Sequence, residues 1–142
     1  MTGLYLIARF AGRTVAIASE QVHSVVDISK VTPVPRSPPF VRGLAALRSR
    51  VVTVIDTPVA LGFPGSGSAR RAVTVHVDGH SYAMLVDALE DVAPFALHPL
   101  ANGLALAPAW RSIALGLIDR DGVPVLAVDL LGLLPTSTAV AA

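Results

Sequence analysis

The chain has 142 residues, a formal net charge of +1, 15% charged residues and no cysteine. A chain of this length buries roughly 70% of the surface that its unfolded form exposes, which is enough for one ordinary domain or two very small fused ones. The balanced charge gives no broad field for nucleic acid or an anionic membrane, and the lack of cysteine excludes disulfides and thiolate chemistry. The 53% of hydrophobic residues fall in short runs, so we expect neither a membrane-spanning helix nor a signal peptide.

The first apolar runs are separated by Gly, Pro and Asp, a pattern typical of strands rather than of long helices. We expect strands over 4–10, 14–18 and 22–28, with a hairpin turn at Gly12-Arg13. Segment 32–40, TPVPRSPPF, holds four prolines, which exclude a helix interior or a central strand. It is predicted to be a stiff extended connector, with a ligand for a proline-binding module as the alternative.

The middle of the chain contains a second predicted hairpin. Runs 43–48 and 51–56 are separated only by Ser49-Arg50. Thr57-Pro58 then resembles a helix start, with Thr57 as N-cap and Pro58 in the first turn. That helix must end before segment 62–69, GFPGSGSA, which has the composition of a flexible linker.

The second half also consists of short apolar runs separated by turn residues, with a strong hairpin signal at Asp78-Gly79 and another turn over 120–122. The expected elements are strands over 71–77, 80–87, 92–97, 113–119 and 123–128, an irregular segment over 98–111, a short helix over 129–134 and a frayed tail over 136–142.

Three β-runs end in an aspartate that precedes a short apolar stretch: Asp56, Asp87 and Asp129. An aspartate in this position ends a strand and caps the next element of the chain. The similarity of these three segments is too weak for a sequence repeat, but it indicates two similar small β-units joined near residues 62–70.

The motifs of common enzyme classes are absent. There is no phosphate loop or nucleophile elbow, and Asp56-Thr57 is followed by Pro58 where the loop of an aspartic protease has glycine. His76 and His80 flank the Asp78-Gly79 turn and could face each other, but two imidazoles make a poor zinc site. We therefore expect no catalytic residue, no cofactor and no metal.

One stretch carries a family resemblance. Segment 31–56, VTPVPRSPPFVRGLAALRSRVVTVID, resembles the signature of CheW-like domains: a Pro-containing loop, an aromatic-Val-x-Gly step, Leu-Arg and a strand that ends in Ile-Asp. The similarity extends over nearly the whole chain, through the opening strands of 4–28, YAMLVDALEDV of 82–92 and the closing LGLIDRDGVPVLAVDLLGLL of 115–134.

The resemblance implies an all-β protein of two small five-stranded SH3-like barrels packed side by side. We place their approximate limits at 14–69 and 70–128, with the N-terminal strand and the C-terminal segment as candidates for crossing between them. It also implies a cytoplasmic, non-catalytic adaptor that is recruited to receptor arrays. Such an adaptor joins the cytoplasmic tip of methyl-accepting chemoreceptors to the regulatory domain of a CheA-type histidine kinase, without nucleic acid or direct membrane insertion.

The resemblance places Arg48 at the family's arginine for coupling receptor to kinase. Gly43 occupies a backbone position with unusual torsions. Val22, Val52 and Val54 lie on strands that would carry an apolar patch, although alternation allows only every second residue to face outward. The candidate protein-binding residues are thus Arg48, Gly43, Val22, Ser24, Ser49, Val52 and Val54.

Two positions depart from the family's pattern. Ser49 stands where glycine follows Leu-Arg, and Ser24 stands where a glutamate is common. The chain therefore lacks a carboxylate that could serve an ionic contact, and the partner contacts at both positions stay open. The alternatives are a CheW-like scaffold for another kinase pathway, such as surface motility or development, and a small β-barrel that binds nucleic acid. Arg70-Arg71 is the basic pair available for the latter, but aromatic residues for base stacking make up only 5%.

Overall fold

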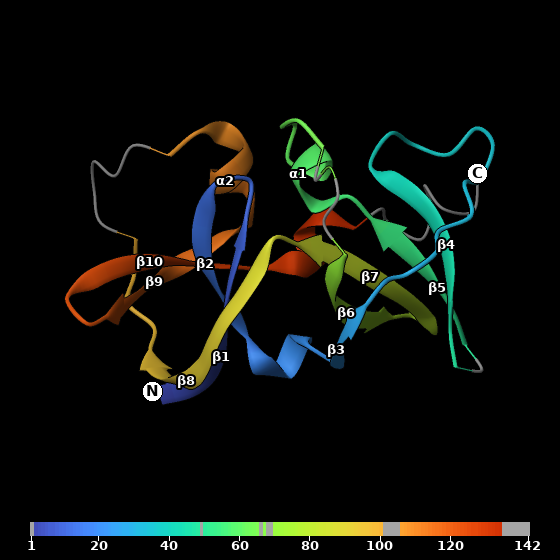
Figure 1. Cartoon of the computed structure of the whole chain (residues 1–142). Coiled ribbons are helices and arrows are strands. Elements are labelled where there is room, and N and C mark those ends of the chain that lie inside the picture. The colour runs from blue at the N-terminus through green and yellow to red at the C-terminus, as the bar shows by residue number, and fades with distance from the viewer. Residues whose placement is uncertain (1, 49, 66, 68–69, 101–105, 135–142) are drawn as a thin grey trace.

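The computed structural model describes residues 2–48, 50–65, 67, 70–100 and 106–134, and ten β-strands in these ranges form two five-stranded sheets (Figure 1). The first sheet has the order β8 (Ala88–Ala96), β1 (Thr2–Phe10), β2 (Arg13–Ala18), β10 (Val123–Val128) and β9 (Ala114–Arg120). The second has the order β3 (Ser24–Asp27), β6 (Arg71–Val77), β7 (His80–Val86), β5 (Arg50–Ile55) and β4 (Val41–Leu47). The expected all-β class with two five-stranded units is confirmed.

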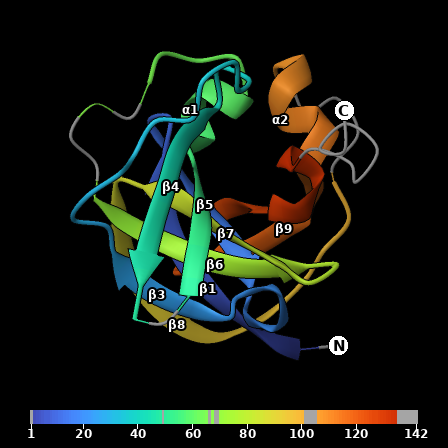
Figure 2. The same ribbon diagram turned by 90° about the vertical axis from the view of Figure 1, so that its right-hand side faces the viewer.

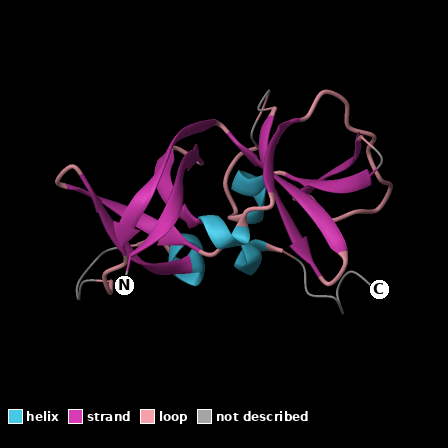
Figure 3. Cartoon of the chain, turned by 90° about the horizontal axis from the view of Figure 1, so that it is seen from below, coloured by secondary structure: helices cyan, strands magenta, loops and turns pink. Residues whose placement is uncertain are grey.

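Each sheet curls into an open barrel, and the two barrels lie side by side with the short helices between them (Figure 3). We call the sheet that contains β1 the first barrel and the sheet that contains β3 the second barrel. The short helices are η1 (Ser19–Gln21), α1 (Thr57–Ala60), α2 (Pro108–Ile113) and η2 (Leu130–Leu133).

The barrels do not divide the chain at residues 69 and 70, where the sequence suggested a boundary. β5 and β6 lie on either side of that point, yet both belong to the second barrel. The second barrel uses one continuous part of the chain, β3 to β7, whereas the first combines β1 and β2 with β8 to β10. The N-terminal hairpin thus joins the C-terminal strands through the parallel pairing of β2 with β10.

The two barrels have matching strand registers. β2 pairs in parallel with β10 at Val15↔Leu126, and β7 pairs in parallel with β5 at Tyr82↔Thr53. One isolated bridge in each barrel, His98↔Leu117 and Thr32↔Leu44, then falls at the equivalent place. Residues can therefore be matched between the barrels strand by strand. For example, Gly116 corresponds to Gly43, because each is the residue before a bridge partner.

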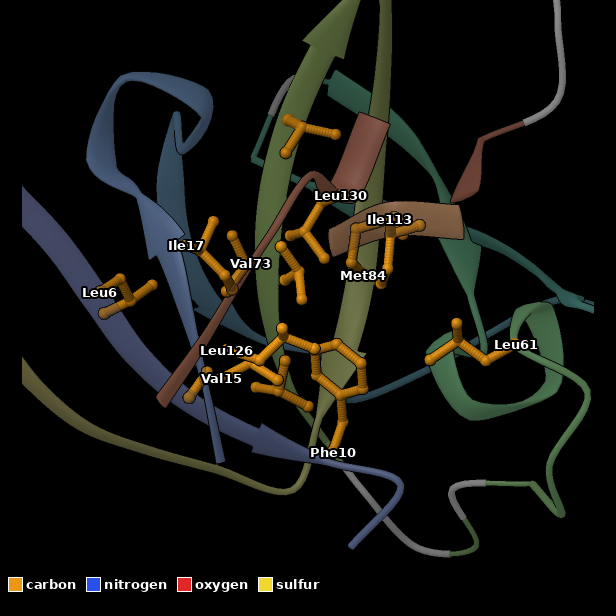
Figure 4. Close-up of a cluster of buried hydrophobic side chains, with 14 of the residues drawn as sticks. Leu6, Phe10, Val15, Ile17, Leu61, Val73, Met84, Ile113, Leu126 and Leu130 are labelled. Atoms are coloured by element: carbon orange, nitrogen blue, oxygen red, sulfur yellow. The ribbon is translucent and has the colours of Figure 1, made fainter. Parts of the chain in front are cut away.

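The central strands are buried on both faces, which explains the unusually apolar composition. In β1, Leu6 and Phe10 face a core shared by the two barrels, while Tyr5 and Ile7 face the inside of the first barrel. The shared core draws side chains from both barrels and the short helices (Figure 4), among them Leu6, Phe10, Val15, Ile17, Leu61, Val73, Met84, Ile113, Leu126 and Leu130.

The interior of each barrel is narrower and is filled partly by alanine. Ala16 and Ala127 lie inside the first barrel, and Ala45, Ala72 and Ala83 lie inside the second. A small side chain fits because facing strands of a small barrel leave little space between them. The apolar excess in the sequence is therefore largely core.

Four local predictions need correction. The first hairpin turn is Ala11-Gly12, one residue before the predicted Gly12-Arg13, because Arg13 already pairs with Phe10. β8 begins at Ala88 rather than near residue 92, because a register shift after Ile7 lets the strand bend and continue past charged residues. The segment 98–111, expected to be irregular, includes the start of α2. The N-cap of α1 is Asp56 and not Thr57, which lies inside the helix.

Asp56 and Asp129 each cap a short helix. Asp56 caps α1, which follows β5 of the second barrel, and Asp129 caps η2, which follows β10 of the first barrel. The Asp56 carboxylate accepts a hydrogen bond from the Val59 backbone N–H at 3.5 Å and lies 2.9 Å from the guanidinium of Arg42. The Asp129 carboxylate accepts bonds from the Leu131 backbone N–H and the Gln21 amide, both at 3.0 Å. The third aspartate, Asp87, caps no helix, because β8 follows it directly.

Asp56→Ala should lower the free energy of unfolding by about 2–3 kcal/mol, since it removes both a helix cap and a largely buried partner of Arg42. Asp129→Ala removes a more exposed cap and should cost about 1 kcal/mol. Urea unfolding of the two variants provides the comparison. Equal losses would mean that the Arg42 contact contributes nothing.

Candidate protein-binding groove

The second barrel has a hollow of about 680 Å³ between its two edge strands, β3 and β4. We call it the edge groove. One wall is residues 23–27, the other is residues 46–48 with Arg50, and the floor includes Val52, Thr74, His76 and Ser81. Figure 2 looks onto the barrel from the side of β4 and β5, with β3 at the lower edge of the sheet.

Arg48 lies on the rim of the edge groove, in the turn between β4 and β5. Its φ is +55°. This left-handed conformation is common in the two-residue turns that connect β-hairpin strands. The equivalent residue of the first barrel, Asp121, has the same conformation with φ +53°. The turn therefore holds an exposed guanidinium beside the groove, and Arg50 follows at the start of β5.

His23 and His76 form a pair in the edge groove. Their ring centroids lie 4.0 Å apart at an interplanar angle of 88°, and His76 Nδ1 is 2.8 Å from the hydroxyl of Ser81. Desolvation and the neighbouring His23 and Arg50 lower the pKa of His76 below its usual value. His76 and His80 are exposed residues of the hairpin and do not face each other, because the hairpin register places His76 opposite Ser81 and leaves His80 beside Tyr82.

Ser24 lies in the wall of the edge groove, on β3. Its hydroxyl and that of Thr74 are 2.6 Å apart, and the Thr74 hydroxyl also donates to the Ser24 carbonyl oxygen at 3.2 Å. The pair satisfies its own polar groups and links β3 to β6. A partner would therefore meet a neutral surface at Ser24.

The three candidate valines are mainly core residues. Val54 is fully buried and Val52 is 2% exposed, both inside the second barrel. Val22 packs against the shared core just after η1. The outward face of β5 belongs instead to Val51, which is 62% exposed. Alternation along the strand thus assigns Val52 and Val54 to the interior.

Gly43 is buried in β4 at φ +146°, where a Cβ would lie 2.3 Å from the Thr32 carbonyl oxygen. This glycine lets the chain at the start of the proline-rich segment, at Val31 and Thr32, pass against β4. Ser49 lies outside the described residues. The structure therefore brings Arg48, Ser24 and Val52 together around the edge groove and leaves Gly43, Val22 and Val54 away from it.

Sequence reasoning missed Arg50, His23 and Thr74 as groove residues. The signal available was weak: Thr74 is a buried polar residue in an otherwise apolar strand, but His23 precedes β3 and Arg50 is exposed at the start of β5. In the described ranges, no three His, Cys, Asp or Glu residues gather in a way that could hold a metal ion. No helix in those ranges has the length and apolar character needed to cross a membrane.

Comparison with known proteins places this fold. The family model described as the CheW-like domain matches residues 4–137. A curated relative, "Chemotaxis protein CheW" of Rhizobium meliloti (strain 1021), is 27% identical over 124 residues, which cover 85% of this chain and 80% of the relative. The crystal structure of the scaffolding protein TtCheW from Thermoanaerobacter tengcongensis superposes with a TM-score of 0.77 at 22% identity, over 96% of this chain and 90% of that one. The family model matches nearly the whole chain, and the chain folds into two barrels. The chain therefore belongs to the CheW-like domain family.

Proposed function

We propose that this protein is a non-catalytic adaptor that couples transmembrane chemoreceptors to a CheA-type histidine kinase in chemotaxis signalling. The observation that carries the proposal is the CheW-like match over residues 4–137, in a chain folded as two barrels. The curated relative is named as a chemotaxis protein, which favours this pathway over surface motility or development. The absence of recognisable catalytic motifs in the sequence agrees with a role in assembly.

The adaptor would work in the cytoplasm, recruited to membrane-associated receptor arrays through its partners. Those partners would be the regulatory domain of the kinase and the cytoplasmic tip of the receptors. An adaptor of this kind transmits a signal through affinity and geometry, so its essential chemistry is an exposed surface that binds two proteins.

A co-purification experiment tests the proposal. The folded protein, immobilised through a tag, should retain a CheA-type kinase and a chemoreceptor fragment from the same organism. Failure to retain either partner, with a native circular dichroism spectrum, would contradict the proposed adaptor role.

Arg48→Glu should weaken kinase or receptor binding about tenfold or more, because it replaces an exposed cation of the groove rim by an anion. Its melting temperature should change little, since the side chain is exposed at a turn. Arg36→Glu is a matched control, because Arg36 is also exposed and also has a positive φ, of +63°. Equal binding by Arg48→Glu and the control would remove Arg48 from the interface.

A further inference from the structure

The two barrels differ at the gap between their edge strands. In the first barrel, Glu90 on β8 and Arg120 on β9 form an ion pair with an N–O distance of 2.7 Å, and this pair connects the two edges. In the second barrel, the register puts Leu47 at the place of Arg120. Ser24 is the counterpart of Asp91, so His23 precedes its strand position as Glu90 does in the first barrel. The edge groove lies at this unlinked gap, with Leu47 in its wall.

Among its described residues, the edge groove carries cations and one carboxylate that is already paired. Arg48 and Arg50 line it, and within the described part of the chain neither forms an ion pair. His23 and His76 add two groups that can become cationic. The carboxylate in the wall, Asp27, is already paired with Arg71 at 2.7 Å.

We propose that a carboxylate-bearing segment of a protein partner occupies the edge groove of the second barrel, and that protonation of the His23–His76 pair strengthens its binding. The partner carboxylate takes the role that Glu90 has within the first barrel. The inference rests on the proposed adaptor function for the identity of the partner, and on charge complementarity for the chemistry of the segment. Arg48 and Arg50 supply a permanent positive charge, and the imidazoles supply one that depends on pH.

The groups that face His76 decide the sign of the pH dependence. They are His23 beside β3, Arg50 on β5 and the Ser81 hydroxyl on β7, while Arg48 and Asp27 line the same groove. Without a partner, desolvation and the charges of His23 and Arg50 lower the pKa of His76. A bound carboxylate opposes that effect and raises the pKa, so binding takes up protons. Affinity should therefore be greatest below the pKa of His76 in the free protein and should fall as pH rises through the pKa of His76 in the complex.

The first measurement is the Kd of the CheA-type kinase regulatory domain, obtained by titration calorimetry at about pH 6 and about pH 8. For the unaltered protein the affinity should be about three- to tenfold higher at the lower pH, and protons should be taken up on binding. The double variant His23→Gln, His76→Gln should lose this difference while still binding at the higher pH. His80→Gln is the matched control, because His80 is exposed on the same hairpin but outside the groove. A pH difference that persists in the double variant would overturn the role of the pair.

The second measurement uses hexaglutamate and hexalysine as probes and detects the histidine ring and arginine side-chain resonances by NMR. Hexaglutamate should shift the signals of His23, His76, Arg48 and Arg50 and raise the apparent pKa of His76, and hexalysine should not. Absence of these shifts would overturn the carboxylate site, even if the kinase domain binds. Conversely, hexaglutamate shifts in a protein that binds neither kinase nor receptor would uphold the site and reject the adaptor function.

Discussion

Gly43→Ala should lower the free energy of unfolding by about 3 kcal/mol or more, the largest effect expected from adding one methyl group to this chain. The added Cβ would lie 2.3 Å from the carbonyl oxygen of Thr32 and 2.7 Å from its carbonyl carbon, so two backbone segments would have to separate. The φ of +146° adds strain for any side chain. Chemical denaturation at equilibrium measures the loss.

Two other glycines serve as references for Gly43. Gly12→Ala, at a hairpin turn with φ +74° and no atom within 4 Å of the added Cβ, should cost only about 1 kcal/mol. Gly116→Ala in the first barrel should behave like Gly43→Ala, because its Cβ would lie 2.3 Å from the His98 carbonyl oxygen. A Gly43 variant no less stable than the Gly12 variant would mean that the loop before β4 moves aside easily.

Phe10→Ala should cost about 3–5 kcal/mol, because it empties the centre of the shared core. Phe10 is fully buried and stacks on Trp110 of α2 with ring centroids 5.6 Å apart. Since both barrels contribute to this core, the variant should unfold in one transition at a lower denaturant concentration. Fluorescence of Trp110 and far-UV circular dichroism should report the same midpoint.

Val123→Ala is the control for Phe10→Ala, since Val123 lies on β10 of the same barrel but is 59% exposed. Its stability should stay within about 0.5 kcal/mol of the unaltered protein. Two separate unfolding transitions in Phe10→Ala, one of them at the original midpoint, would show that the barrels hold together independently and would refute the shared core as their common support.

Local turn chemistry made most of the hairpins predictable from the sequence. Asp78-Gly79 supplies two residues with positive φ, +50° and +80°, at the turn where the sequence places them. Asp121-Gly122 does the same at +53° and +83°. A turn of this type restricts which residues can occupy it, so a short pattern is enough to locate the strands on either side. The resemblance of segment 31–56 then supplied the number of barrels, which turn chemistry alone does not contain.

The inward and outward faces of the strands could not be predicted. Val51, Val52 and Val54 are similar residues on one strand, yet Val51 is exposed and the other two are buried. Strands that are buried on both faces lose the alternation of apolar and polar residues on which such predictions depend. The side that faces a core is then set by the neighbouring barrel, which is distant in sequence.

The edge groove could not be predicted from the sequence either, because the residues that form it are distant along the chain. His23 precedes β3 and His76 lies on β6, and their rings meet only because β3 pairs with β6 across a long separation. The sequence showed only the close spacing of His76 and His80 across a tight turn, whereas the histidine that contacts His76 is His23. Arg48 could be singled out because it falls within the family signature, whereas Arg50 had no comparable pattern.

The route of the chain through the first barrel has a consequence for how the protein folds during synthesis. β2 can gain its partner β10 only after Val128 has been made, whereas β3 to β7 are complete once Val86 has been made. Closing so long a loop costs entropy before the new contacts compensate for it, and contacts between distant residues slow folding. The N-terminal hairpin therefore lacks its strand partner β10 until the end of that strand has been synthesised. Premature release of the chain after β7 would leave that hairpin without its barrel and open to aggregation.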